Sequence, residues 1–236
     1  MTPRRAKVAA AAAAPLTAAA FCATTAVSRE TGVRLEAYAR LLVHWQETFN
    51  LVGRASLADL WRRHFLDSAQ LRPLLLSQPT IATALAAGGA PALIDLGSGA
   101  GFPGLVLAII EPRLDVHLIE SNGRKCAFLR AVARATGTRV TVHDGRIETI
   151  AIGDAGAPPP AAAITARGCA PLPRLLELAA PLLDPTGVCL FLKGRRANEE
   201  LTAAAKTWKI SHRTVPSLSD ASGVVVILSE IVRERS

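Results

Sequence analysis

The sequence is poor in aromatic residues and has no paired metal-binding motif. Phe, Trp and Tyr make up 4% of its 236 residues, so a buried core must consist mainly of Ala, Leu, Val and Ile. The cysteines are Cys22, Cys126, Cys169 and Cys189, and none of them forms a CxxC pair. Their spacing argues against a zinc site and against a disulfide framework. We therefore predict reduced thiols and no metal.

Long uncharged apolar runs are also missing, and no stretch of about 18 apolar residues predicts a membrane span. Residues 1–27 carry Arg4, Arg5 and Lys7, no acids, and alanine runs that Pro15 interrupts. A targeting signal is one interpretation of this composition. Because alanine is only weakly hydrophobic, we predict instead an alanine-rich tail, disordered or loosely helical, on a cytoplasmic protein.

Acidic residues are outnumbered, with 19 Asp and Glu against 27 Lys and Arg and a formal net charge of +8. Half of the residues are apolar, which excludes global disorder. The length fits one large domain with a small appendage. A basic folded domain favours a polyanionic partner such as RNA or DNA.

The chain after the tail falls into two parts. Residues 28–78 predict an N-terminal helical segment, in which Ser28 caps one helix and Ser56, with Asp59 three positions on, begins a second with a capping box. Residues 79–236 alternate between short apolar strands and helices. This alternation predicts an α/β fold with a mostly parallel, doubly wound sheet and helices on both faces. The last two expected strands, at 210–215 and 224–231, have no room for a crossover helix, so we predict one antiparallel strand.

A glycine-rich turn follows the first expected strand, with glycines at 97, 99, 101 and 104. Glycine permits a sharp turn and close approach of a ligand to the backbone. The spacing also matches the dinucleotide fingerprint and does not choose between cofactors. Asp95, just before the turn, would oppose a pyrophosphate and suits the ammonium group of S-adenosylmethionine. We predict that Asp95 binds this group directly or through water, with a helix or turn cap as its alternative role.

Glu120 ends the second expected strand, where an acid accepts hydrogen bonds from the ribose hydroxyls of an adenosine ligand. NAD and S-adenosylmethionine both carry such a ribose. The third expected strand leads into residues 144–148, where a side chain or a backbone N–H can hold the adenine edge; taken alone, this stretch would be a polar turn.

Four sequence blocks together resemble the family of bacterial small-subunit rRNA (guanine-N7) methyltransferase G, once called glucose-inhibited division protein B. They are Asn50-Leu-Val52, Arg63-His-Phe-Leu-Asp-Ser68, Ile94-Asp-Leu-Gly-Ser-Gly-Ala-Gly-Phe-Pro-Gly104 and Phe191-Leu-Lys-Gly194. The resemblance covers about residues 28–231. It implies a Rossmann-like class I methyltransferase that uses S-adenosylmethionine and methylates N7 of a guanine in the 530-loop of 16S rRNA.

The resemblance also assigns site residues by position. It implies that Gly97 and Phe102 line the cofactor loop, together with Gly99 and Gly101 of the same turn. It also implies that Ile147 and Glu148 flank the adenine and that Arg167 lies at the edge of the cofactor or active site. We expect Arg167 and Asp67 to orient the guanine, with a structural ion pair or cap as their alternative role. The family usually has Ser-Arg-Ala where this chain has Ala166-Arg167-Gly168.

An RNA substrate requires a basic surface, and three clusters are candidates. They are Arg62, Arg63 and His64; Arg124 and Lys125; and Lys193, Arg195 and Arg196. The expected partner is 16S rRNA or a small-subunit precursor, and the expected state is a monomer.

Other functions stay open at this point. The chain could methylate another RNA or a small molecule, could be a non-catalytic rRNA-binding assembly factor, or could be an NAD-dependent oxidoreductase. The basic clusters argue against a small-molecule substrate. The intact glycine loop argues against a non-catalytic factor, and Asp95 argues against a dinucleotide cofactor.

Overall fold

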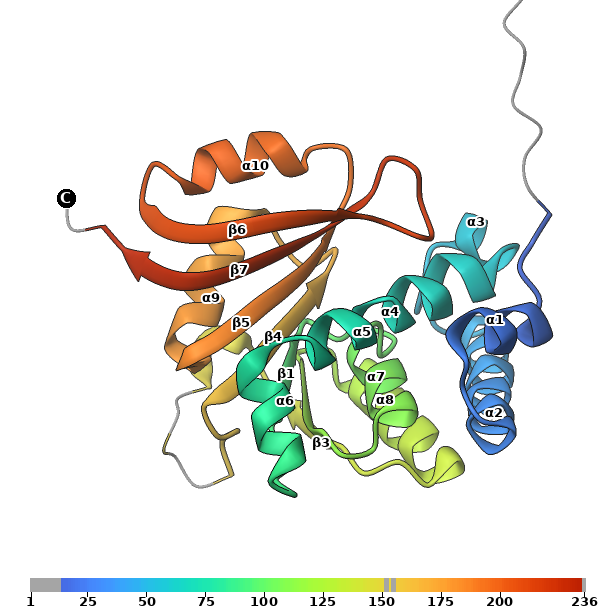
Figure 1. Cartoon of the computed structure of the whole chain (residues 1–236). Helices are drawn as coiled ribbons and strands as arrows, with labels where there is room; N and C mark the ends of the chain where they lie inside the picture. Colours follow the sequence, from blue (N-terminus) through green and yellow to red (C-terminus); the bar gives the residue numbers. More distant parts are fainter. Residues whose placement is uncertain (1–13, 151–152, 154–155, 235–236) are drawn as a thin grey trace, which may run out of the picture.

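The computed structural model describes residues 14–150, 153 and 156–234. In this part of the chain, a seven-stranded sheet has the order β3-β2-β1-β4-β5-β7-β6 (Figure 1). The strands are β1 (Ala92–Leu96), β2 (Asp115–Glu120), β3 (Thr141–Asp144), β4 (Ala161–Arg167), β5 (Leu183–Lys193), β6 (Trp208–Pro216) and β7 (Val224–Arg233).

Strands β1 to β5 are parallel, whereas β7 pairs antiparallel with both β5 and β6. The predicted doubly wound sheet with a reversed strand is therefore confirmed. The strand order changes direction between β1 and β4, and ligands of such sheets bind in the crevice at this point, beyond the carboxyl ends of the strands.

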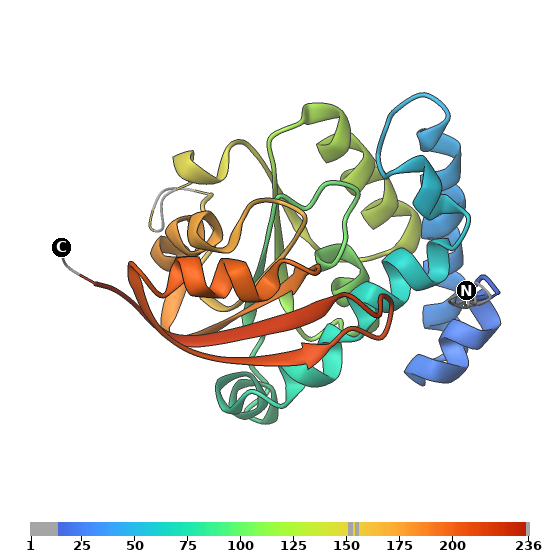
Figure 2. The same cartoon turned by 90° about the horizontal axis from the view of Figure 1, so that it is seen from above.

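Helices cover both faces of the sheet (Figures 1 and 2). The helices are α1 (Ala18–Thr25), α2 (Arg29–Gln46), α3 (Arg54–Leu57), η1 (Trp61–Leu66), α4 (Asp67–Ala69), α5 (Leu71–Leu76), α6 (Pro79–Ala86), α7 (Gly104–Ile110), α8 (Gly123–Thr136), η2 (Ile147–Thr149), α9 (Leu172–Ala179), η3 (Ala180–Leu182) and α10 (Ala197–Ala204). None of these described helices has the length and apolarity needed to cross a bilayer.

Alternating side chains of the strands supply two apolar layers. Leu93 of β1 and Leu190 of β5 pack with α2, α7 and α8 on one face. Ile94 and Phe191, each the next residue along, pack with α9 and α10 on the other. Successive side chains of a strand point to opposite faces, and both faces here are apolar because helices cover both.

The N-terminal helical segment is less regular than its sequence predicts. The hydroxyl of Ser28 accepts a hydrogen bond from the Thr31 amide and caps α2, as expected. Ser56, however, does not begin a helix, because its hydroxyl donates to the carbonyl oxygen of Gly53. The expected second helix is divided into α3, the π-helical η1, α4 and α5. A π-helical turn of this kind occurs frequently at functional sites.

The tail predicted over residues 1–27, disordered or loosely helical, is more ordered than expected in the part that the structure describes. Residues 18–25 form α1, which lies beside α2 at the side of the molecule away from the C-terminus (Figures 1 and 2). The ring of Phe21 has no exposed surface and lies 5.3 Å from the ring of Trp61, centroid to centroid. Phe21 therefore buries more apolar surface than the small alanine side chains of α1 can. Residues 1–13 lie outside the described residues.

Replacing Phe21 with Ala should lower the free energy of unfolding by about 3 kcal/mol, since a fully buried Phe is lost and a cavity is left beside η1. Urea unfolding measures the change. Val33→Ala, at an exposed position of α2, serves as control and should cost far less. An equal effect of the two substitutions would show that α1 does not pack in solution.

Candidate active site

The glycine turn after β1 is held by contacts that exclude side chains. Gly97 and Gly101 have φ of +63° and +93°. A Cβ on Gly97 would lie 2.7 Å from Sγ of Cys169, and one on Gly101 would lie 2.6 Å from the hydroxyl oxygen of Tyr38. That hydroxyl donates a hydrogen bond to the carbonyl of Ala100. Around Gly99, in contrast, the nearest atom to an added Cβ is 3.8 Å away, so the loop leaves room there for a ligand against the backbone.

Asp95 lies beneath this turn and has no exposed surface. Its Oδ1 accepts a hydrogen bond of 2.8 Å from the Thr165 hydroxyl, and its Oδ2 accepts one of 3.2 Å from the amide of Gly104. Burial raises the pKa of Asp95 to about 6. These hydrogen bonds occupy one acceptor site on each oxygen, and binding of the ammonium group by Asp95, directly or through water, stays a prediction. The alternative role, a cap at the start of α7, is what the geometry shows.

Glu120, at the end of β2, lies next to the turn and is largely buried. Its Oε2 accepts a hydrogen bond of 2.8 Å from the amide of Gly99, and its Oε1 accepts one of the same length from Asn122. A carboxylate has about four lone-pair sites. Glu120 therefore both fixes the loop and keeps acceptor capacity for ribose hydroxyls.

Another expected cofactor contact differs in its placement. Phe102 is almost fully buried and stacks on Tyr38 with ring centroids 5.2 Å apart, so it points into the core rather than lining the loop surface. Ile147 and Glu148 lie on η2, directly after β3, where the sequence predicts them. The Glu148 carboxylate pairs with Arg174 at 2.6 Å and is about 40% exposed, and its contact with the adenine stays a prediction.

A pocket of about 450 Å³ opens beside the carboxyl end of β4. Arg167 and Asp67 both line it and form an ion pair of 3.1 Å. The guanidinium also donates to the carbonyl of Arg63 and to Nδ1 of His64, and it lies 5.0 Å from the ring centre of Phe102. The alternative role of Arg167 and Asp67, a structural ion pair, is therefore observed, and their role in orienting a guanine stays a prediction.

Hydrogen bonds fix the protonation state of His64. Its Nδ1 faces an Arg167 N–H at 2.8 Å and must accept, so Nε2 carries the proton and donates to the Ser56 hydroxyl at 2.7 Å. Burial, together with the charge of Arg167, lowers the pKa of His64 to about 3. His64 is thus neutral, buried and a support for Arg167, and its expected role as a surface RNA contact is wrong.

The sequence analysis missed the far wall of this pocket, which comes from the β6–β7 connection. The Ser219 hydroxyl donates to Oδ1 of Asp67, and Asp220 forms an ion pair of 2.8 Å with Arg63. Gln70 accepts a hydrogen bond of 2.8 Å from the amide of Leu218. These partners are about 150 positions apart along the chain. No local sequence pattern predicts that they meet.

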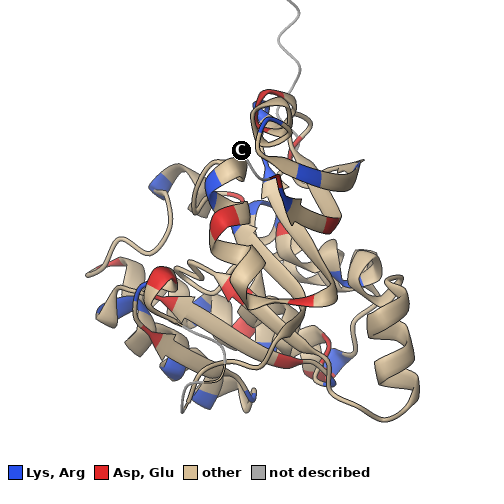
Figure 3. Ribbon diagram, turned by 90° about the vertical axis from the view of Figure 1, so that its left-hand side faces the viewer, with Lys and Arg blue, Asp and Glu red and all other residues tan. Residues whose placement is uncertain are grey.

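The basic clusters divide into exposed and engaged residues. Lys193 lines the pocket, but its ammonium pairs with Glu200 at 2.7 Å and its side chain is only 9% exposed, so its contact with RNA stays a prediction. Arg62 is held by Asp59 and Arg63 by Asp220 at the surface. The residues at 124, 195 and 196 are exposed, and Lys125 is half-buried. Figure 3 shows basic and acidic positions interspersed on the side that it displays.

At residues 166–168 this chain has Ala-Arg-Gly where the family usually has Ser-Arg-Ala, and the glycine has a local structural reason. Gly168 has φ of +62°, a conformation that glycine adopts at no steric cost. A Cβ there would meet no atom within 4 Å. Glycine therefore lets the chain turn directly after Arg167 while the guanidinium stays in the pocket.

Asp95→Asn should change the pH dependence of stability. An acid whose pKa is raised on folding binds more protons in the folded state, so the wild type loses stability as the pH rises from about 4 to about 6. Asn has the shape of Asp. Its side-chain oxygen can accept from the Gly104 amide while its NH2 group donates to the Thr165 hydroxyl. The variant should therefore gain about 2 to 3 kcal/mol relative to the wild type between pH 4 and pH 7.

Urea unfolding across this range measures the difference, with Glu36→Gln on the exposed face of α2 as control. A difference between variant and wild type that stays constant with pH would contradict the raised pKa.

Comparison with known proteins agrees with this geometry. A family model described as rRNA small subunit methyltransferase G matches residues 32–225. The "Ribosomal RNA small subunit methyltransferase G" of Paramagnetospirillum magneticum is 54% identical over 210 residues, which is 89% of this chain and 94% of that protein. The protein of the same name from Rhodospirillum rubrum is 46% identical and covered over its full length, by 92% of this chain.

A solved structure of the O-methyltransferase TomG from Streptomyces achromogenes, in complex with SAM, aligns with a TM-score of 0.51 at 14% identity. The alignment covers 83% of this chain and 89% of TomG, and it supports the Rossmann-like fold. The family match confirms the resemblance of the four sequence blocks, and with it the expected methyltransferase class and its use of S-adenosylmethionine. Over most of its length, then, this chain belongs to the rRNA small subunit methyltransferase G family.

Proposed function

We propose that this enzyme methylates N7 of a guanine in the 530-loop of 16S rRNA, in the cytoplasm and as a monomer. The observation that carries the proposal is the pocket lined by Arg167 and Asp67, which opens beside the glycine turn of a chain in this family. The turn would hold S-adenosylmethionine, and the pocket would hold the base.

The residues of the turn fit a cationic methyl donor. No Lys or Arg occurs from Gly97 to Gly104, while the carboxylates of Asp95 and Glu120 lie directly against the loop. Such surroundings disfavour a pyrophosphate, which needs positive partners, and favour a ligand with an ammonium and a sulfonium. S-adenosylmethionine supplies an electrophilic methyl group when it is bound.

Arg167 keeps donors for the substrate. Three of its five N–H groups donate to Arg63, Asp67 and His64 in the part of the chain that the structure describes. Its side chain is 21% exposed at the pocket. Arginine commonly pairs with guanine O6 and N7. Since N7 must stay open to attack, we assign the remaining donors to O6 or to a neighbouring phosphate.

The reaction requires no general base. Guanine N7 has a lone pair and no proton, so the N7–methyl bond forms as the sulfur–methyl bond breaks, and the electron pair returns to sulfur. The protein therefore acts by alignment. The methylated base is cationic, and the Asp67 carboxylate, which is mostly buried in the pocket wall, is placed to stabilise that charge.

Arg167→Lys should lower the rate of methyl transfer by about 10- to 100-fold, because a lysine keeps the charge but loses the planar fork that contacts three partners. The affinity for S-adenosylmethionine should stay close to that of the wild type, since Arg167 lies on the pocket side of the loop. Single-turnover transfer to 16S rRNA and calorimetry with the cofactor measure the two quantities. Arg213→Lys, on the exposed edge strand β6, is the matched control.

The acceptor position is tested by mass-spectrometric mapping of 16S rRNA from cells with and without the gene for this chain. Loss of one N7-methylguanine from the 530-loop is the expected result. An unchanged 530-loop together with a lost methyl group elsewhere would overturn the proposed acceptor.

A further inference from the structure

A second hollow of the molecule lies away from the pocket and the glycine turn. It is an open groove of about 1210 Å³ between the C-terminal half of α8, the segment before β2 and the connection from α6 to β1. Asp115 and Thr141, which begin β2 and β3, line it, so it lies at the amino edge of the sheet. The glycine turn follows the carboxyl end of β1, at the opposite edge. A six-residue strand separates the two edges by about 20 Å.

The groove is strongly basic. Its charged lining consists of Arg113, Arg130, Arg134 and Arg139, with Asp115 as the single acid. Arg113 is held by Glu111 at 2.6 Å, and Arg130 lies 3.8 Å from Asp144. Arg134 and Arg139 are exposed, and neither has a carboxylate within 4 Å in the part of the chain that the structure describes. Neither guanidinium group is therefore neutralised by an ion pair within the described residues.

The shape of the groove favours a large anion. A small ligand is normally enclosed over most of its surface, and its polar partners are buried. Here the arginines are exposed along an open rim, while the floor is apolar and includes Leu114 and Val140. Exposed, weakly held guanidinium groups suit the regularly spaced phosphates of a nucleic acid backbone.

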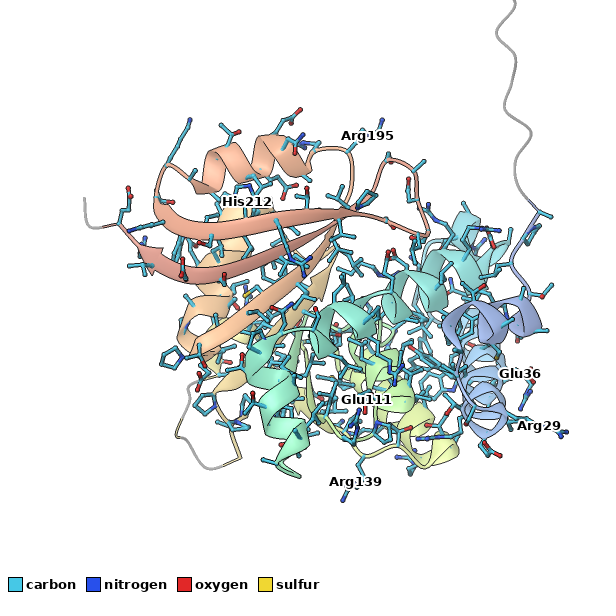
Figure 4. The ribbon with its side chains drawn as sticks, in the orientation of Figure 1. Arg29, Glu36, Glu111, Arg139, Arg195 and His212 are labelled. Carbon is cyan, nitrogen blue, oxygen red and sulfur yellow. The ribbon has the colours of Figure 1, made fainter. Side chains whose placement is uncertain are left out.

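Helix α8 connects this groove with the active-site edge. It begins at Gly123, next to Arg124 and Lys125 of the expected RNA surface, and ends at Thr136 in the groove. Its fourteen residues span about 21 Å. Figure 4 shows that Arg139 points away from the molecule at the side opposite Arg195, which belongs to the active-site edge.

We infer that this groove is a second RNA-binding surface, which holds the phosphate backbone of a segment of rRNA other than the one that carries the reacting guanine. The inference rests on the proposed function in taking rRNA as the substrate. The groove supplies affinity and orientation, whereas the pocket beside the glycine turn supplies the choice of base. Phosphate contacts of this kind fix register without reading sequence.

The test is the double variant Arg134→Glu with Arg139→Glu, titrated with unmethylated 16S rRNA over a series of salt concentrations. The matched control is Lys209→Glu with Arg213→Glu, which makes the same change in net charge on β6, at the far edge of the sheet from β3. We expect the groove variant to bind RNA at least tenfold more weakly at low salt. The slope of log affinity against log salt should fall by about 1.5, as for two lost phosphate contacts.

The affinity for S-adenosylmethionine and the transfer rate at saturating RNA should be unchanged in the groove variant. Equal RNA affinities and salt slopes for the groove and control variants would overturn the inference. Mapping the methylated base in the same reactions separates the two claims. If the 530-loop is methylated but the groove variant binds RNA as well as the control variant, only this inference is overturned. If the groove variant binds RNA more weakly than the control but no N7-methylguanine forms in the 530-loop, only the proposed acceptor is overturned.

Discussion

The buried carboxylate of Asp95 is the constraint on which the site depends. One side chain joins the end of β1 to the first amide of α7 and to the hydroxyl of Thr165 on β4. Burying an ionised group without partners is costly, and two hydrogen bonds recover only part of that cost. The raised pKa of Asp95 reflects the remainder. The protein tolerates this cost at the one position where the sheet order reverses and the chain must turn sharply above a ligand.

Hydrogen bonds to its neighbours likewise hold Arg167 in place. Its guanidinium lies between a carboxylate, a backbone carbonyl and a neutral imidazole, and each contact uses a different direction of the planar group. The π-helical η1 supplies both Arg63 and His64 to this arrangement, and α1 packs against η1 through Phe21. The packing of α1 against η1 therefore supports the two residues that hold the Arg167 guanidinium in the pocket.

Much of the fold could be predicted from the sequence, because strand and helix periods, the glycine turn and the short link before β7 are local features. The site was predicted in part. The resemblance points to both Arg167 and Asp67, but their ion pair follows from the sequence only as an alternative role. A motif shows where Asp95 and Phe102 occur along the chain but not which way their side chains point. A run of basic residues does not show which members, such as His64 and Lys193, find partners inside the fold.

The walls of the pocket come from distant parts of the chain. Residues near 63–67 form one side, and residues 217–224 form the other, with Arg167 between them. The glycine turn and its supports, Thr165 and Cys169, come from residues 95–169, whereas the pocket has no second wall until residues 217–224 have joined the fold. A chain truncated before residue 217 therefore retains the residues of the turn but lacks that wall.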